Sequence, residues 1–163
     1  MNEISSAGIS IKYAPEATAG TRPTSDYLAK AATGTMNIAD YVTGISGLQA
    51  DYDTYDVTPL SETKAHRFIR GLMSNDGNIT FAANINKVSR TDWGLVVDAY
   101  ETAAGAGKDL WFEITLNGDT ESFFFSGEPC DADFPDVEAG SAVQGNLNII
   151  LHNIAGWNAK STT

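Results

Sequence analysis

The sequence has very little that would support chemistry at a metal or redox centre. Among 163 residues there are one cysteine, Cys130, and two histidines, His66 and His152. A single cysteine excludes an internal disulfide and a cysteine cluster for zinc. The histidines do not stand at a metal-ligand spacing such as H-E-x-x-H. We therefore expect no metal site, and an unreactive thiol in a reducing compartment.

The motifs of common enzyme classes are also missing. The stretch "GISGL" departs from the G-x-S-x-G nucleophile elbow, and no G-x-x-x-x-G-K-[ST] loop is present to hold a nucleotide phosphate. Five acids between residues 128 and 138 would suit a hard cation, but their spacing does not match an EF-hand. We expect no catalytic residue, no cofactor and a solvated acidic loop.

Basic residues and long apolar runs are scarce. Ten Lys and Arg stand against 21 Asp and Glu, for a net charge of −11. Proteins that grip nucleic acid neutralise phosphates with Lys and Arg, so specific nucleic-acid binding is disfavoured. No apolar run approaches the roughly 20 residues of a membrane helix, and "MNEISSAGIS" lacks the features of a signal peptide. We expect a soluble protein made in a cytoplasm, without membrane binding.

What is present is a series of alternating segments with one amphipathic helix. Strands are expected at 7–14, 36–47, 50–58, 78–86 and 142–157, and a hairpin at 109–129 with its turn at Asn117–Asp119. A helix is expected at 89–105, with Ser89 as N-cap and Asp92 completing a capping box. The tally of about seven strands predicts a mainly β, α+β protein. We expect a single domain over 1–163, a β-sandwich or open barrel flanked by the helix.

Two segments fit neither pattern. Residues 14–35 contain two prolines, two glycines and many small polar residues, and they predict a long loop or arm. Both a contact arm, with Arg22, Tyr27 and Leu28 as its contact residues, and simple disorder remain open. Residues 158–163 are expected to form a flexible C-terminal tail.

Polar strand faces are the most informative feature. Neutral amides follow the outward side of two strands: Asn84, Asn86, Gln144, Asn146 and Asn148. They predict either a smooth, weakly interacting wall or an ordinary solvated sheet face. In the strand at 50–58, neither face is purely apolar, because Asp51, Asp53 and Tyr55 share one side. Such a strand is expected at a sheet edge or a subunit boundary.

The segment "TYDVTPLSETKAHRFIRGLMSNDGNITFAANIN" resembles the major tail tube proteins of long-tailed bacteriophages. The matching motifs are Asp-Val-Thr at 56–58, Phe-Ile-Arg-Gly-Leu at 68–72, and a strand from Gly77 to Ile85. The order of the later elements agrees, so the resemblance covers roughly residues 36–157. The family often has Pro where this chain has Arg70.

The resemblance implies a virion structural protein that forms stacked hexameric rings in the phage tail. Its partners would be further copies of itself, a tape measure protein, tail-tip or initiator proteins and a tail terminator. Double-stranded DNA would pass through the tube without specific binding. The amide-bearing strand faces would then line the lumen, and residues 14–35 would bridge successive rings. Assembly would take place in the host cytoplasm.

The segment from His66 to Leu72 is expected to be a loop shaped for a neighbouring subunit. Phe68, Ile69 and Leu72 would be its anchors, together with Asp51, Asp53 and Tyr55 of the preceding strand. The alternative is that the three apolar anchors pack in the subunit's own core.

Two other functions remain open. A tube subunit of a bacterial contractile injection or secretion system would share the fold and chemistry of a phage tube protein. A carbohydrate-binding or adhesin β-sandwich would need exposed aromatic rings on a flat face, which Trp111, Phe123 and Phe125 would supply. The alternative is that these rings alternate into the core, because the Phe-Phe-Phe run at 123–125 lies within a hairpin that must bury at least one face.

Overall fold

The computed structural model describes residues 8–23, 38–49, 51–74 and 77–160. The strands are β1 (Ser10–Pro15), β2 (Val42–Ser46), β3 (Asp51–Asp56), β4 (Phe68–Ser74), β5 (Asn78–Asn84), β6 (Leu110–Thr115), β7 (Glu121–Pro129) and β8 (Gln144–Ala159). The helices are the α-helix α1 (Lys87–Gly105) and a short 3-10 helix, η1 (Ile38–Asp40). The expected mainly β protein with one α-helix is confirmed.

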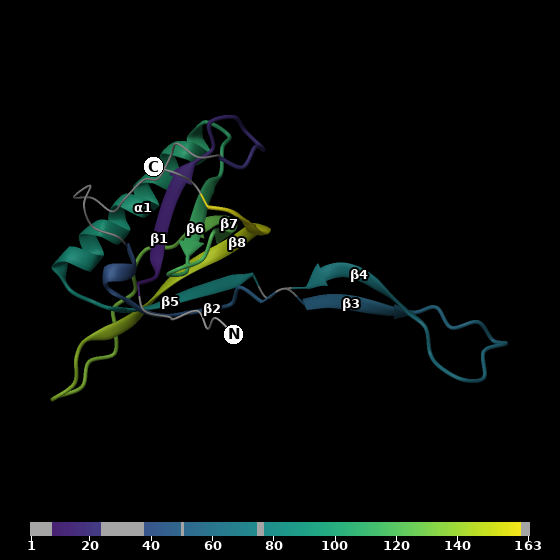
Figure 1. Ribbon diagram of the computed structural model, residues 1–163. Helices are drawn as coiled ribbons and strands as arrows, with labels where there is room; N and C mark the ends of the chain where they lie inside the picture. Colours follow the sequence, from purple (N-terminus) through teal and green to yellow (C-terminus); the bar gives the residue numbers. More distant parts are fainter. Residues whose placement is uncertain (1–7, 24–37, 50, 75–76, 161–163) are drawn as a thin grey trace.

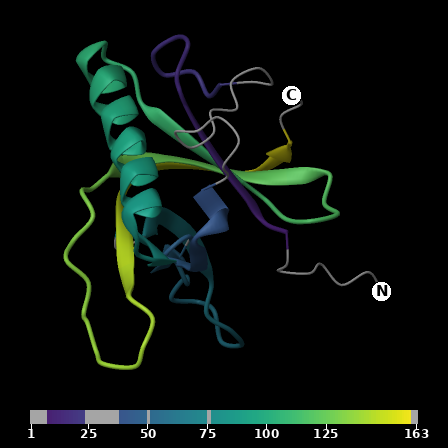
Figure 2. The same ribbon diagram turned by 90° about the vertical axis from the view of Figure 1, so that its left-hand side faces the viewer.

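Six strands form one antiparallel sheet, in the order β1-β6-β7-β8-β5-β2. The 16-residue strand β8 pairs with β5 through its first half and with β7 through its second half. The sheet therefore bends along β8, and α1 crosses one of its faces (Figures 1 and 2). β3 and β4 form a separate two-stranded sheet that points away from this body.

The core lies between the sheet and the helix. On β5, Ile79, Phe81 and Ala83 are fully buried, as their alternation predicts. They meet Trp93 of α1, whose ring stands edge-on to Phe81 with 6.2 Å between ring centroids. The buried members of this core are Ile11, Tyr13, Ile38, Tyr41, Val96, Val97, Leu110, Phe112, Ile114, Phe125, Leu147 and Ile149, with the four already named.

The N-terminus of α1 differs from the expectation. Asn86 is the N-cap, and Ser89 is the third residue of the helix rather than its cap. The two residues exchange hydrogen bonds: Ser89 N donates to Asn86 Oδ1, and Asn86 N donates to Ser89 Oγ, both at 2.9 Å. Asp92 therefore has no capping role and is buried instead. Asn is among the best N-cap residues, so the helix starts earlier than predicted.

Three boundaries also differ. Within the described part of the predicted strand at 36–47, Ile38–Asp40 form η1 and only Val42–Ser46 is extended. β8 continues to Ala159, where Glu121 is its partner, so a tail beginning at residue 158 is wrong. Phe68–Ser74 is a strand paired with β3, so the predicted loop from His66 to Leu72 is half of a hairpin.

Candidate assembly surfaces

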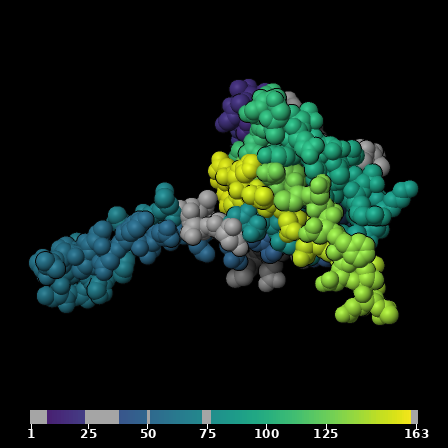
Figure 3. Space-filling model, turned by 180° about the vertical axis from the view of Figure 1, so that it is seen from behind, coloured from purple at the N-terminus to yellow at the C-terminus, as the bar shows by residue number. Residues whose placement is uncertain are grey.

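The β3–β4 hairpin is the most exposed element of the molecule. All six residues of β3 are solvent-exposed, and β3 and β4 pack chiefly on each other. The hairpin projects from one side of the body, well clear of the helix and the main sheet (Figures 1 and 3). Apart from the residues of the arm, it contains the six residues that the sequence predicts to contact another subunit: Asp51, Asp53, Tyr55, Phe68, Ile69 and Leu72.

Large apolar side chains of the hairpin face solvent on both of its sides. Tyr55 and Ile69 are directly opposite each other in the register and are both 53% exposed. Phe68, opposite Asp56 on the other side, is 59% exposed, and Leu72 is 78% exposed. The alternative that Phe68, Ile69 and Leu72 pack in the subunit's own core is therefore wrong.

Two side-chain contacts order the middle of the hairpin. A Cβ at Gly71 would overlap the Tyr55 ring, so the ring lies directly against the Gly71 backbone. On the other side, the Arg70 guanidinium sits 4.6 Å from the centroid of the Tyr52 ring, in a cation–π contact. The Tyr52, Tyr55 and Arg70 side chains that make these contacts are all exposed to solvent.

The tip of the hairpin, residues 57–67, is closed by polar contacts. Val57 N donates to Arg67 O at 2.8 Å, and Arg67 N donates to Thr58 Oγ1 at 2.8 Å. Asp56 accepts from the Thr58 hydroxyl and backbone N–H, and these bonds, with a weaker one from His66, lower the pKa of Asp56. Arg67 pairs with Glu62 at 3.2 Å. Leu60 stands fully exposed at the end of this turn.

The amide face is the surface of β5 and β8 that points away from the helix, and we define it by Thr80, Asn84, Gln144, Asn146 and Asn148. Gln144 Nε2 donates to Asn84 Oδ1 at 3.1 Å, and Thr80 Oγ1 donates to Asn148 Oδ1 at 3.2 Å. The face therefore carries no charge and satisfies some of its polar groups by itself. Asn86 was expected on this face but lies beyond the end of β5, at the helix N-cap.

The described part of the predicted arm belongs to this subunit's own fold. Arg22 lies over the Phe124 ring, 4.3 Å from its centroid. Glu16 is buried and accepts a hydrogen bond from Trp111 Nε1 at 2.9 Å. Residues 16–23 thus cover part of the sheet face that α1 does not cover. Tyr27 and Leu28 lie outside the described residues.

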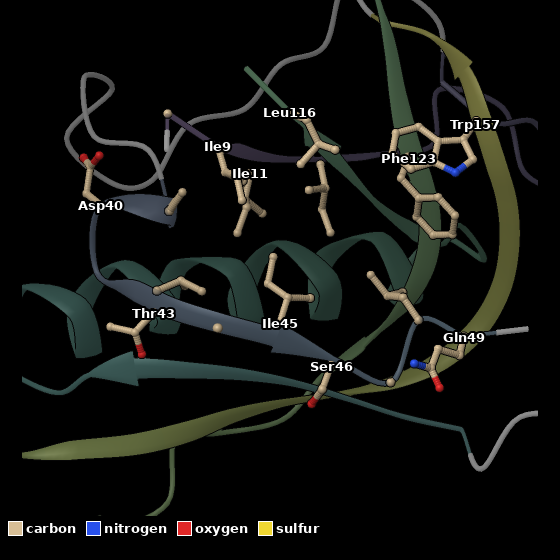
Figure 4. A pocket seen from close by; sticks show the side chains of 17 residues that line it. Ile9, Ile11, Asp40, Thr43, Ile45, Ser46, Gln49, Leu116, Phe123 and Trp157 are labelled. Carbon is tan, nitrogen blue, oxygen red and sulfur yellow. The ribbon is translucent and has the colours of Figure 1, made fainter. Parts of the chain in front are cut away.

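An apolar cleft of about 1010 Å³ opens between the two edge strands of the sheet, β1 and β2. Figure 4 shows Ile9 and Ile11 on one side and Ile45 on the other, with Phe123 and Trp157 at one end. The rings of Phe123 and Trp157 meet edge-on, with centroids 5.5 Å apart. The approach of the two edges gives the sheet the character of an open barrel.

The acidic loop, residues 130–143, projects from the side of the body opposite the hairpin (Figures 1 and 3). Its ends are anchored, because Trp93 Nε1 donates to Cys130 O at 2.6 Å and Ile85 N donates to Val143 O at 2.9 Å. Between these anchors, Phe134 is 90% exposed and Val137 is 60% exposed.

Cys130 has the environment of an inert thiol. Burial raises its pKa, and the nearby carboxylates Glu128, Asp133 and Asp131 raise it further. Among the described residues, no group of three or more His, Cys, Asp or Glu is arranged to hold a metal ion. Within the same ranges, no helix is long and apolar enough to cross a membrane.

The aromatic rings that an adhesin would need are not displayed. Trp111 is 5% exposed and Phe125 is fully buried, while Phe123 is partly buried at the end of the cleft. The flat aromatic face expected of a carbohydrate-binding sandwich is therefore not formed by these three residues.

Sequence reasoning missed the exposed apolar residues at the ends of the two projections. Leu60 and Phe134 each stand between a proline and a polar residue, so no hydrophobic periodicity includes them. Local composition could have indicated that they are exposed. Each residue adjoins a proline in a segment that has neither a strand nor a helix pattern.

Comparisons with known proteins establish the fold but no family. No family model matches the sequence, and no curated protein matches it. Solved structures contain chains of similar fold, among them the following two. One is the anti-feeding prophage cap, described as its tube-terminating cap, with a TM-score of 0.55 and 16% identity over 98% of this chain and 93% of that chain. This chain and that cap chain share a tail-tube-like fold.

The second is the anti-feeding prophage baseplate, determined with six-fold symmetry. Its TM-score is 0.54 at 9% identity, and the match covers 96% of each chain. Both matches span nearly the whole of this chain.

Proposed function

We propose that this chain is a structural subunit of a tail-like injection particle, and that its copies form rings that stack into a tube. The observation that carries the proposal is the β3–β4 hairpin, which exposes apolar side chains on both faces at a distance from its own core. Exposed apolar surface of this kind marks protein–protein contact sites. The shared fold with chains of a particle cap and baseplate supports the same function.

The structural comparisons favour a bacterial injection system over a siphovirus tail, since the cap and baseplate chains described above come from the anti-feeding prophage. The sequence pattern at 54–86 resembles phage tail tube proteins. In this proposal either kind of particle would use a ring-forming subunit of this fold. The identity of the genes next to the gene for this chain would distinguish the two.

In this proposal the amide face lines the channel. It is uncharged, and a net charge of −11 on each subunit disfavours adhesion of passing DNA. The hairpin residues Tyr55, Phe68, Ile69 and Leu72 contact the neighbouring subunit. Head-to-tail contacts of this kind form a closed ring when the rotation that relates successive copies adds up to a full circle.

The test is negative-stain electron microscopy of the purified full chain over a range of concentrations, with sedimentation velocity on the same samples. We expect rings or hollow tubes with six-fold symmetry. A monodisperse monomer at every concentration, or irregular clusters without a central channel, would overturn the proposal.

A further inference from the structure

The two projections of the molecule differ in charge. The tip and β4, residues 57–74, hold three cations, Lys64, Arg67 and Arg70, and one acid, Glu62. The paired strand β3 holds three further acids, Asp51, Asp53 and Asp56, so the positive charge of the hairpin lies at its tip and along β4. The acidic loop at 130–143 holds four acids and no basic residue. Three of the ten Lys and Arg in the chain therefore lie on one projection of a strongly acidic protein.

The hairpin also contains acids near its tip, but internal partners engage them. Glu62 is paired with Arg67, and Asp56 accepts from Thr58 and lies 3.4 Å from His66. Outside the Glu62–Arg67 pair, the cations of this segment are Lys64 at the tip and Arg70 on β4. Both are exposed, and Arg70 is held in place by its contact with the Tyr52 ring.

Each projection also carries exposed apolar side chains among its charges. Leu60 stands fully exposed at the hairpin tip, and Phe134 and Val137 are exposed within the acidic loop. Interfaces commonly place apolar anchors at the centre and charged residues at the rim. The tip of the hairpin, residues 57–67, and the acidic loop are thus opposite in the sign of their charge, and both expose apolar side chains.

The projections lie on opposite sides of the body, so one molecule cannot bring its own pair together (Figures 1 and 3). Two copies can do so, and each pairing leaves a free hairpin on one copy and a free loop on the other. We propose that the tip of the hairpin of one copy docks on the acidic loop of the next copy. This inference rests on the proposed function and names the partner surface for the hairpin.

Zero-length carbodiimide cross-linking of the full chain tests the pairing directly. An equimolar mixture of ¹⁴N- and ¹⁵N-labelled protein is coupled, digested and analysed by mass spectrometry. We expect mixed-isotope cross-links between Lys64 and Asp131, Asp133 or Asp136. Lys64→Arg keeps the charge but removes the amine, so it should abolish these cross-links without changing sedimentation.

Charge reversal provides the second measurement. Hairpin variant Lys64→Glu/Arg70→Glu and loop variant Asp133→Lys/Asp136→Lys should each raise the concentration for half-association at least about tenfold. The four-substitution variant should return to within about threefold of wild type. The matched control is Lys87→Glu/Lys160→Glu, which changes exposed charges on the body by the same amount.

The loop variant separates specific pairing from general repulsion. It makes the chain less negative than −11, so weaker repulsion between copies would strengthen association, whereas loss of the pairing weakens it. Stronger association of the loop variant, or no recovery in the four-substitution variant, would overturn the pairing. So would cross-links from Lys64 to acids of the body in place of the loop.

These outcomes are distinct from a failure of the proposed function. The protein could give the mixed-isotope cross-links, and the four-substitution variant could recover association, while electron microscopy shows only open strings or transient pairs. That result would support the pairing of hairpin and loop and refute the proposed tube. Rings or tubes in every charge variant, without the expected cross-links, would retain the tube and refute the pairing.

Discussion

A single carboxylate, that of Glu16, ties the end of β1 to the sheet face that α1 leaves uncovered. It accepts three hydrogen bonds, from Trp111 Nε1 at 2.9 Å and from the backbone N–H groups of Gly20 at 2.8 Å and Asp109 at 3.2 Å. Burial acts to raise the pKa of Glu16, but these bonds outweigh burial and hold the pKa below its ordinary value of 4.5.

We expect Glu16→Ala to lower the free energy of unfolding by about 2–3 kcal/mol at pH 7, because a buried indole N–H loses its acceptor. Since the folded-state pKa is lowered, the part of this contribution that depends on the ionised carboxylate is present above pH 4.5 and is lost as the pH falls through the folded-state value. Urea unfolding at pH 7 and in acid measures both effects.

Glu101→Ala on the exposed side of α1 is the matched control and should change stability by less than about 0.5 kcal/mol. An equal loss from both substitutions, or a Glu16→Ala loss that does not shrink in acid, would contradict the role of the buried carboxylate.

Asp92 has the opposite effect on stability. It is 1% exposed, and within the described part of the chain its Oδ2 has no hydrogen-bond partner. Burial and then the charge of Asp40 raise its pKa. The folded state therefore binds the proton more tightly than the unfolded state, and the ionised group destabilises the fold above the folded-state pKa.

Asp92→Asn should accordingly raise the free energy of unfolding by about 1 kcal/mol at pH 7.5. The gain should disappear as the pH falls below the ordinary Asp value of 3.8, where the wild-type carboxyl is neutral in both states. Thermal melts across this pH range provide the measurement. A gain that is independent of pH would show that charge is not the cause.

At the scale of elements, the N-terminus of α1 depends on one reciprocal pair. Asn86→Ala removes the side chain that accepts from Ser89 N, and we expect it to lower the free energy of unfolding by about 1 kcal/mol. Asn84→Ala, two residues earlier on the exposed side of β5, should have a smaller effect. If Asn86→Ala instead left stability unchanged and altered assembly, its predicted place at the lumen would regain support.

The hairpin should separate assembly from folding. Phe68→Ala and Leu72→Ala remove side chains that are mostly exposed in the subunit, so the melting temperature should change by less than about 2 °C. Both should weaken assembly at least about tenfold in sedimentation velocity, since central apolar anchors dominate interfaces. Leu95→Ala, at an exposed apolar position of the body, is the control. Early melting with unimpaired assembly would refute the anchor role.

The elements that build the core could be predicted from the sequence, and the hairpin only in part. In β5 and β8 one face must be buried, so the alternation of Ile79, Phe81, Leu147 and Ile149 is a physical requirement of the fold. β4 packs on no core, so nothing imposes alternation on it, and the segment at 66–72 has the pattern of a loop. The mixed faces of β3 did predict that this strand lies outside the core.

The contacts of the candidate site were less predictable still. Ion pairing of Glu62 with Arg67 and stacking of Arg70 on Tyr52 depend on the turn geometry and the strand register. Neither can be obtained from composition. The charges of the two segments can be read from the sequence. That the segments project from opposite sides of the body, so that they could pair only between copies, is known only from the structure.

At the scale of the whole molecule, the hairpin is an insertion between two strands that already pair. β2 and β5 are antiparallel neighbours, with Ser46 opposite Thr80, so their ends meet where the hairpin departs. Replacing residues 50–76 with Asn-Gly would join them by a short turn. We expect this variant to fold with a melting temperature within about 5 °C of wild type and to remain monomeric.

Near-ultraviolet circular dichroism verifies the fold of the deletion variant, and sedimentation velocity with electron microscopy measures its assembly. Rings or tubes formed by the shortened chain would exclude the hairpin as the principal contact. Loss of the near-ultraviolet signal would show instead that the hairpin contributes to the core, contrary to its exposure in the structure.

The separation of the hairpin from the core has a further consequence for how the protein is measured. A lone two-stranded ribbon is at best marginally stable in water, so β3 and β4 should open without the body unfolding. Calorimetric and optical melts would then report only the body and would miss damage to the hairpin. Amide exchange between residues 51 and 74 would report it, with fast exchange in the free subunit and strong protection once a neighbour has closed over the ribbon.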